Sequence, residues 1–191
     1  MSDLEHRIKQ LLEPILELQD PRPRIGSYHD MPYAIFRYDP EEEFELRRQV
    51  KLLETRLSQK GKRVTRISLA ECLDQAMQAE RSLAEWASIE REMGTETTVD
   101  TVHALLDQSS PLPDLVASRF PGSADPHRDI VFIMRAGALF PVYRCHTILE
   151  QLHGRLIVPA VLFYPGTLDG EHGLRFMGVL DADPNYRPKI F

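Results

Sequence analysis

The chain has 191 residues, of which 42% are hydrophobic and 27% charged, enough for one globular domain with a sizeable core. Its net charge of −6 disfavours broad electrostatic binding to DNA or RNA. No apolar run is long enough to cross a membrane, the N-terminus does not resemble a signal peptide, and the two cysteines form neither a disulfide framework nor a zinc site. These features predict a cytoplasmic protein.

An amphipathic helix is predicted over residues 3–19, followed by a proline-rich linker over residues 21–32. Pro14 is expected to kink or split this helix, because proline has no N–H to donate. Residues 1–20 therefore form an arm, and its packing on its own domain or on a partner remains open. Residues 33–191 are predicted to form a single α/β domain. The apolar stripe of the arm consists of Leu4, Ile8, Leu11, Leu12, Ile15 and Leu18.

The first half of the domain is predicted as a strand, a helix, a second strand and three further helices. Short apolar runs predict the strands, and apolar residues at helical spacing predict the helices. Asp39 caps the first of these helices, Pro40 takes its first position, and Gly94 ends the long second helix. The predicted ranges are 33–38 and 64–69 for the strands and 40–61, 69–93, 98–106 and 112–120 for the helices.

The second half contains a strand–helix–strand unit and a last strand. Together with the first half, this order predicts a three-layer α/β sandwich with about five mostly parallel strands and helices on both faces. The layout resembles that of a P-loop NTPase that has lost its chemistry. The predicted ranges are 130–134, 156–164 and 173–180 for the strands, the second of them ending at Pro165-Gly166, and 142–152 for the helix.

The turn after the first strand is unsuited to phosphate. A phosphate-binding loop needs glycines, whose backbone N–H groups converge on the ligand, and a lysine. Here four acidic residues crowd residues 39–43, Pro40 removes a donor, and no GxxxxGK[ST] motif occurs. The negative charges would repel a phosphate, so this turn is interpreted as a well-capped surface helix.

Arg135, at the end of the strand over residues 130–134, has two interpretations. It binds an acidic group of a ligand or partner, or it pairs with an internal acid such as Asp39. Cys145 and His146 do not form a nucleophilic pair, because adjacent helical residues point about 100° apart, so Cys145 is expected in the core. The histidines lack metal-ligand spacing. We predict no catalytic residue, cofactor or metal.

Aromatic and arginine residues gather in the last third of the chain. Tyrosine and arginine are enriched at interface hot spots, so this set predicts a partner-binding surface, although scattered surface residues are the simpler interpretation. The candidate residues are Arg135, Phe140, Tyr143, Arg144, Tyr164, Arg175, Tyr186 and Arg187.

The order and spacing of several short motifs carry a resemblance that covers residues 33–191. The motifs are Arg37-Tyr38-Asp39-Pro40, Arg135-Ala136-Gly137, Leu139-Phe140-Pro141, a helix through Arg144, Leu149 and Leu152, the run from Pro159 to Gly166, Leu174-Arg175-Phe176 and Tyr186-Arg187-Pro188. The chain resembles BrxB, a small component of BREX phage-defence systems.

The resemblance implies a role in bacterial defence, in an operon that also encodes a methyltransferase, a large ATPase and the phosphatase-like protein PglZ. It implies binding or scaffolding, plausibly toward PglZ, and no established enzymatic activity or catalytic residues. Two alternatives stay open from the residues: a nucleotide-binding or nuclease-like enzyme that uses the crevice at the strand ends, and a DNA-binding accessory factor.

Overall fold

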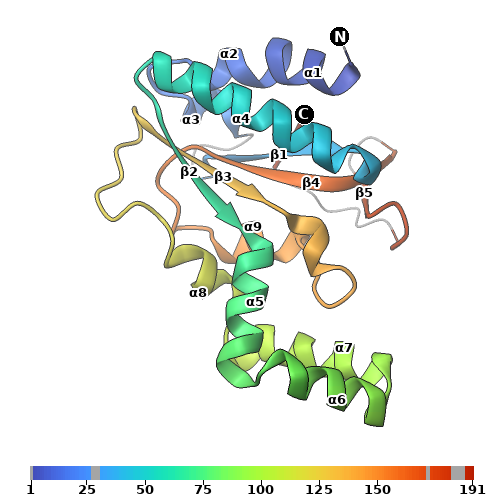
Figure 1. Ribbon diagram of the computed structural model, residues 1–191. Coiled ribbons are helices and arrows are strands. Elements are labelled where there is room, and N and C mark those ends of the chain that lie inside the picture. Colours follow the sequence, from blue (N-terminus) through green and yellow to red (C-terminus); the bar gives the residue numbers. More distant parts are fainter. Residues whose placement is uncertain (1, 27–30, 171–172, 182–187) are drawn as a thin grey trace.

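The computed structural model describes residues 2–26, 31–170, 173–181 and 188–191 (Figure 1). At its centre lies one sheet, in which five strands follow one another and all neighbours are parallel. A further short strand pairs antiparallel with the end of one of the five. In spatial order the five are β2 (Arg63–Ser68), β3 (Asp129–Met134), β4 (Ala160–Asp169), β1 (Tyr33–Tyr38) and β6 (Lys189–Ile190), and the sixth is β5 (Gly173–Phe176).

Helices cover both faces of the sheet, as a parallel sheet requires (Figure 1). The face that is uppermost in Figure 1 carries α1 (Asp3–Arg7), α2 (Glu13–Leu16) and α4 (Glu43–Gln59). The lower face carries α5 (Leu69–Glu80), α8 (Leu112–Ala117) and α9 (His146–Gln151). Alternate residues of the strands pack into two hydrophobic cores. Phe36 and Phe132 lie in the upper core, and Ile35 and Ile133 lie in the lower core. The predicted three-layer α/β architecture is confirmed.

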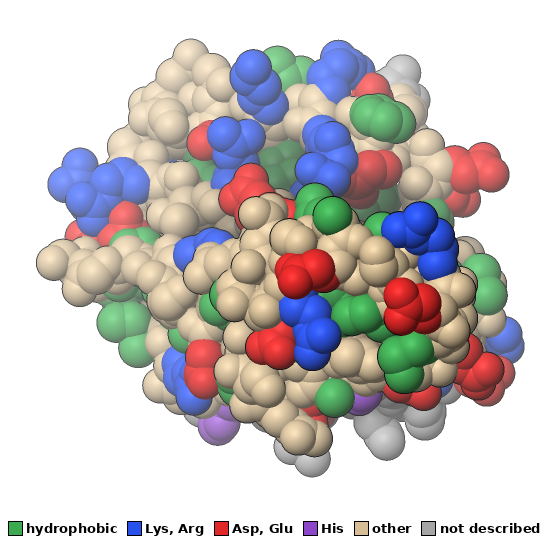
Figure 2. All heavy atoms as spheres, turned by 60° about the horizontal axis from the view of Figure 1, so that its bottom comes forward, with side chains coloured by type: hydrophobic (Ala, Val, Ile, Leu, Met, Phe, Trp, Pro, Cys, Tyr) green, Lys and Arg blue, Asp and Glu red, His purple; other side chains and the backbone are tan. Residues whose placement is uncertain are grey.

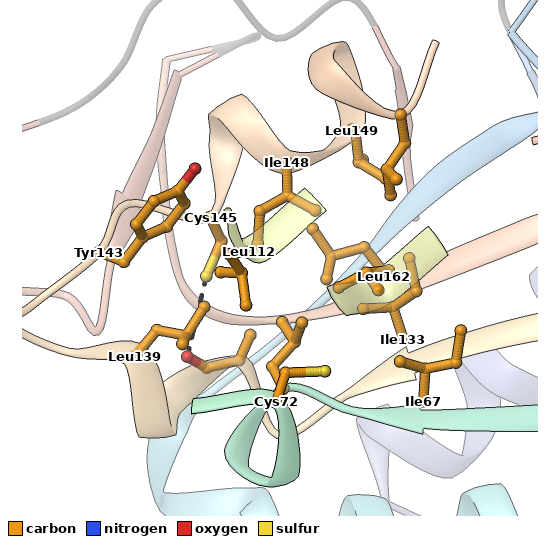
Figure 3. Close-up of a cluster of buried hydrophobic side chains, with 14 of the residues drawn as sticks. Ile67, Cys72, Leu112, Ile133, Leu139, Tyr143, Cys145, Ile148, Leu149 and Leu162 are labelled. Carbon is orange, nitrogen blue, oxygen red and sulfur yellow. Dashed lines mark hydrogen bonds between the residues drawn. The ribbon is translucent and has the colours of Figure 1, made fainter. Parts of the chain in front are cut away.

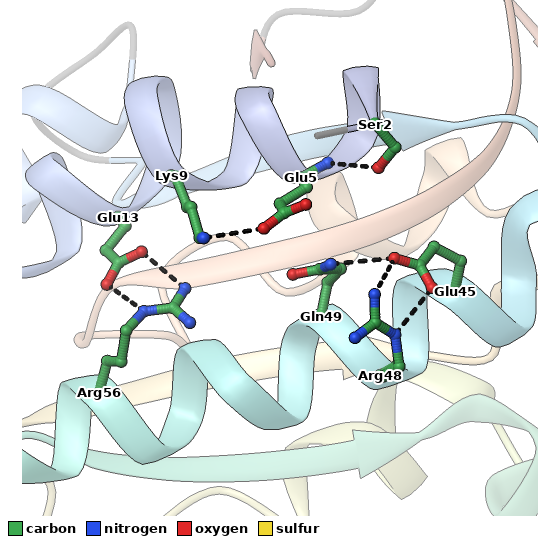
Figure 4. A network of polar contacts seen from close by, with 8 residues as sticks. All are labelled: Ser2, Glu5, Lys9, Glu13, Glu45, Arg48, Gln49 and Arg56. Atoms are coloured by element: carbon green, nitrogen blue, oxygen red, sulfur yellow. Dashed lines mark hydrogen bonds and ion pairs between the residues drawn. The ribbon is translucent and has the colours of Figure 1, made fainter.

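The N-terminal helix packs on the upper face of its own domain. Its inward residues join the upper core with no exposed surface. A bidentate ion pair between Glu13 and Arg56 fastens it to α4 (Figure 4). Near Pro14 the helix widens into a π-helical segment, Ile8–Leu12, in which the Glu13 N–H donates to the Ile8 carbonyl. The helix is thereby split, and α3 (Arg22–Ile25) follows it. The inward residues are Leu4, Ile8, Leu12 and Leu16.

The long helix that was predicted over residues 69–93 is two helices, so that prediction is wrong. After α5, Arg81 is extended, with φ −155° and ψ 156°. Ser82 and Glu85 then form a capping box that starts α6 (Leu83–Met93). The next helix, α7 (Thr95–Ala104), begins directly after Gly94 rather than at residue 98, and a π-helical segment, Leu105–Ser109, continues it.

Helices α6 and α7 form a hairpin that projects from the lower layer (Figure 1). Trp86 anchors it: the indole is 4% exposed, and its Nε1–H donates to the Met77 carbonyl. Between residues 83 and 104 the sequence has five acidic residues and one arginine, a net charge of −4 out of −6. Figure 2 brings the hairpin forward and shows acidic and hydrophobic side chains interspersed on it. The negative charge of the protein is therefore concentrated on this projection.

Four elements of the C-terminal third differ from prediction. Strand β5 ends at Phe176, not at residue 180. Helix α9 begins at His146, not at residue 142, so Tyr143 precedes it. Strand β4 does not end at Pro165-Gly166 but continues to Asp169, because antiparallel pairing with β5 takes over there. The tail was predicted to be irregular, yet β6 pairs in parallel with β1, and the Phe191 N–H donates to the Ile35 carbonyl.

Candidate functional site

The strands β1, β3 and β4 end at the same edge of the sheet because they are parallel. The chain leaves β1 toward α4 on the upper face and leaves β3 toward α9 on the lower face (Figure 1). Open α/β sheets bind ligands at such a divergence, outside the carboxyl ends of the strands. We call this region the carboxyl edge.

Glu43 is the centre of the polar contacts at the carboxyl edge. Its carboxylate accepts a hydrogen bond from the hydroxyl of Tyr38, the last residue of β1. The same carboxylate accepts from Arg47 Nε at 2.8 Å, and Arg135 Nε lies 3.9 Å from it. Burial and then the bond to Glu43 raise the pKa of the Tyr38 phenol. One glutamate thus joins the ends of β1 and β3.

Arg135 therefore pairs with an internal acid, but the acid is Glu43. Asp39, the residue that was offered as an example, instead caps the first helical turn and accepts from the Glu41 N–H at 2.9 Å. Arg135 itself has left-handed backbone angles, φ 62° and ψ 33°, which are unfavourable for a residue with a side chain. Its side chain stays 43% exposed, so the pair leaves the guanidinium accessible.

A hollow of about 520 Å³ lies beside Arg135, between α4, β2 and β3. In Figure 2, Lys and Arg side chains flank a hollow with hydrophobic side chains at its floor, above the helical hairpin. Such a hollow can receive apolar and acidic groups together. The apolar lining consists of Val64, Ile67 and Met134, and the charged lining of Arg47, Arg66, Arg135, Glu54 and Glu71.

Two tyrosines of the predicted partner-binding set are buried, so their rings do not form an exposed surface in this structure. Tyr164 is 1% exposed, because β4 continues past it and the Phe176 ring of β5 covers it at 5.4 Å between ring centres. Tyr143 is 5% exposed, and its hydroxyl donates to Gln151 at 3.2 Å. Phe140 is half-buried, and its ring lies 6.1 Å from Phe176. These aromatic rings support the edge from beneath.

The remaining candidates divide into exposed and undescribed residues. Arg144 is exposed. Arg175 is 43% exposed and pairs with Asp169 across the β4–β5 hairpin, at 2.9 Å. Tyr186 and Arg187 lie outside the described residues. The structure thus joins Phe140 and Tyr164 through Phe176, whereas Arg135 and Arg175 belong to separate ion pairs.

Sequence reasoning missed Glu43, Arg47 and Arg66. Glu43 and Arg47 are one helical turn apart, a spacing that predicts their pairing but not their position beside β3. Arg66 is one of two arginines in a short strand, a composition typical of a sheet edge. These local signals could have pointed to the Glu43–Arg47 pair and to Arg66.

Cys145 belongs to the lower core, as expected from its place in the apolar pattern. Figure 3 shows it among Tyr143, Leu139 and Ile148, and its thiol donates to the Ala136 carbonyl. Burial raises its pKa. In the described part of the chain, no three His, Cys, Asp or Glu side chains come close enough to hold a metal ion. The described helices include none that is long and apolar enough to span a bilayer.

Together, the fold and the site define a parallel α/β sandwich in which the protein's own side chains occupy the carboxyl edge. A sequence profile of the family described as "BREX protein BrxB" matches residues 65–190, more than half of the chain. The chain therefore belongs to the BrxB family of BREX phage-defence systems. A protein described as BREX protein BrxB from Bacillus cereus (strain H3081.97) is 29% identical over 189 residues, which cover 98% of this chain and 96% of the relative. No solved structure matches the chain.

Proposed function

We propose that the protein is a non-catalytic interaction component of its BREX system and that it binds PglZ through the carboxyl edge. The observation that carries this proposal is the contact of Glu43 with Tyr38, Arg47 and Arg135. In an α/β enzyme this position receives the ligand. Here a single carboxylate links two strand ends, while the guanidinium of Arg135 remains accessible to a partner.

The side chains around this contact support binding to a protein. Phe44, the residue after Glu43, is 80% exposed, and the guanidinium of Arg47 lies 5.4 Å from the centre of its ring. Arg144 is also exposed. Exposed aromatic and arginine side chains of this kind contribute most to protein–protein interfaces, because they bury large areas and donate several hydrogen bonds.

Co-purification with tagged PglZ, made from the same operon, tests this proposal. Arg135→Ala and Phe44→Ala should each weaken binding by about tenfold or more, the effect of a loss near 1.4 kcal/mol. Arg91→Ala, which removes an exposed arginine from the α6–α7 hairpin, is the matched control and should bind normally. If Arg135→Ala, Arg144→Ala and Phe44→Ala all fold and leave both association and phage defence intact, the proposed surface is wrong.

A second candidate function is nucleotide binding, favoured by the three arginines that line the hollow of about 520 Å³. Guanidinium groups bind phosphate well, because they donate several hydrogen bonds in one plane. Thermal shift with ATP or GTP and Mg²⁺ tests it, since a ligand at 100 times its dissociation constant adds about 2.7 kcal/mol of stability. An unchanged melting temperature with every nucleotide would remove this candidate.

A further inference from the structure

Strand β2 lies at one end of the sheet, and β3 is the strand that pairs with it. We propose that its free edge binds an extended, acidic segment of the partner protein, which adds a strand to the sheet. This inference rests on the proposed function, because it names the segment type that the interaction protein recognises. Strand addition of this kind uses main-chain hydrogen bonds for affinity and side-chain contacts for specificity.

The backbone of β2 shows which groups are free. The Arg63 N–H donates to the Arg128 carbonyl at 2.7 Å, on the side of β3. Backbone groups alternate in direction along a strand, so Thr65 and Ile67 also face β3, whereas Val64 and Arg66 face away. Among the described residues β3 is the strand that pairs with β2, so the N–H and C=O of Val64 and Arg66 face no partner strand. Each of these two residues offers one donor and one acceptor.

Open space adjoins this edge along its length. The hollow of about 520 Å³ lies beside Val64, Arg66 and the end of β2. A second hollow, of about 570 Å³, lies between Arg66 and the C-terminal half of α4. Both are lined by Glu54 and Arg66, so they adjoin one another. Side chains of an added strand would enter this space beneath α4.

The charges around the edge favour an acidic segment. The two hollows are lined by four cationic side chains and two acidic ones, in a chain whose net charge is −6. Arg66 pairs with Glu54 at 3.4 Å, but its side chain is 56% exposed, so it can also contact an incoming carboxylate. The cations are Arg47, Lys51, Arg66 and Arg135, and the acids are Glu54 and Glu71.

A second copy of the chain fits this edge less well. Antiparallel pairing of two β2 strands would bring two arginine-lined edges together, and like charges across a sheet are unfavourable. Short edge strands with cationic side chains are a common means of preventing such self-association. The acidic segment of a different protein has the opposite charge and meets no such repulsion.

Amide hydrogen exchange, followed by NMR on the ¹⁵N-labelled protein, tests the inference directly. In the free protein, the N–H groups of Val64 and Arg66 should exchange at least about tenfold faster than those of Thr65 and Ile67, which are bonded to β3. In the complex with purified PglZ, the exchange of Val64 and Arg66 should slow to the level of their neighbours. Thr65 and Ile67 are the internal controls.

Two substitutions give an independent readout. Val64→Pro removes a donor that the fold does not use, so the protein should still fold, with a modest loss of stability from the half-buried valine, while binding PglZ about tenfold or more weakly. Arg66→Glu should weaken binding by a similar factor, and Arg66→Lys should restore most of it, because the lysine keeps the positive charge. The PglZ segment cross-linked from position 66 should be extended and acidic.

The outcomes separate this inference from the proposed function. If PglZ binds but Val64 and Arg66 gain no protection, and Val64→Pro binds normally, the edge is not the docking site and the proposed function stands. Protection of both amides in the free protein, or a dimer that Val64→Pro dissolves, also overturns the inference. If PglZ does not bind at all, the proposed function fails and the inference fails with it.

Discussion

The ion pair between Glu13 and Arg56 should stabilise the docking of the N-terminal helix measurably. The two carboxylate oxygens lie 2.6 and 2.7 Å from Nε and Nη2 of the guanidinium. The Glu13 side chain is 11% exposed and that of Arg56 30%. Breaking a fully buried pair costs about 3–5 kcal/mol. Because Arg56 can turn partly into water, we expect Glu13→Ala to cost about 2 kcal/mol.

Urea unfolding measures this difference as a shift of the midpoint at an unchanged slope. The double variant Glu13→Met with Arg56→Met should regain most of the loss, because it leaves no unpaired buried charge. Arg48→Ala, which breaks an exposed pair on the same helix, is the control and should leave the midpoint unchanged. A Glu13→Ala midpoint equal to that of the unmodified protein would show that the ion pair does not stabilise the docked helix.

Three further predictions follow from buried groups and close approaches. Burial and the bond to Glu43 raise the pKa of the Tyr38 phenol in the folded protein. The stability that this group contributes is therefore complete below about pH 10 and falls by about 1.4 kcal/mol per pH unit as the pH rises above it. In urea unfolding, Tyr38→Phe should remove this alkaline loss. Burial raises the pKa of Cys72 and Cys145, so neither thiol should react with a thiol reagent before unfolding, and rapid reaction of the native protein would contradict their burial. A Cβ at Gly166 would lie 2.3 Å from the Arg175 carbonyl oxygen. Gly166→Ala should therefore lower the free energy of unfolding by about 1–3 kcal/mol in thermal unfolding. An unchanged melting temperature would mean that β4 and β5 lie further apart at Gly166 than this distance implies.

Several features followed from local sequence alone. The apolar run of residues 33–38 coincides with β1, and Asp39 with Pro40 starts the helical segment that leads into α4. The break at Ser82 was also readable, because a serine three residues before a glutamate is a local capping signal. Apolar spacing correctly assigned Cys145 to the core. These features depend on interactions between residues that are close in the chain.

The candidate site depended on contacts that local sequence does not contain. Arg135 pairs with Glu43 rather than with Asp39, because the position of α4 brings Glu43 beside the end of β3. Pairing with β5 extends β4 and places the Phe176 ring against Tyr164, which is buried. Strand β6 has two residues and too little local pattern to be predicted.

Sequence by itself determined the class of the fold and the order of most elements, because apolar periodicity and capping act within a few residues. It also carried the family resemblance, through the order of motifs along the chain. Tertiary structure alone decided that the N-terminal helix docks on its own domain and that Glu43 joins β1 to β3. It also decided that β2 ends the sheet, with the backbone N–H and C=O groups of Val64 and Arg66 directed away from β3. Those outcomes depend on the positions of residues distant in sequence, which only the packed chain fixes.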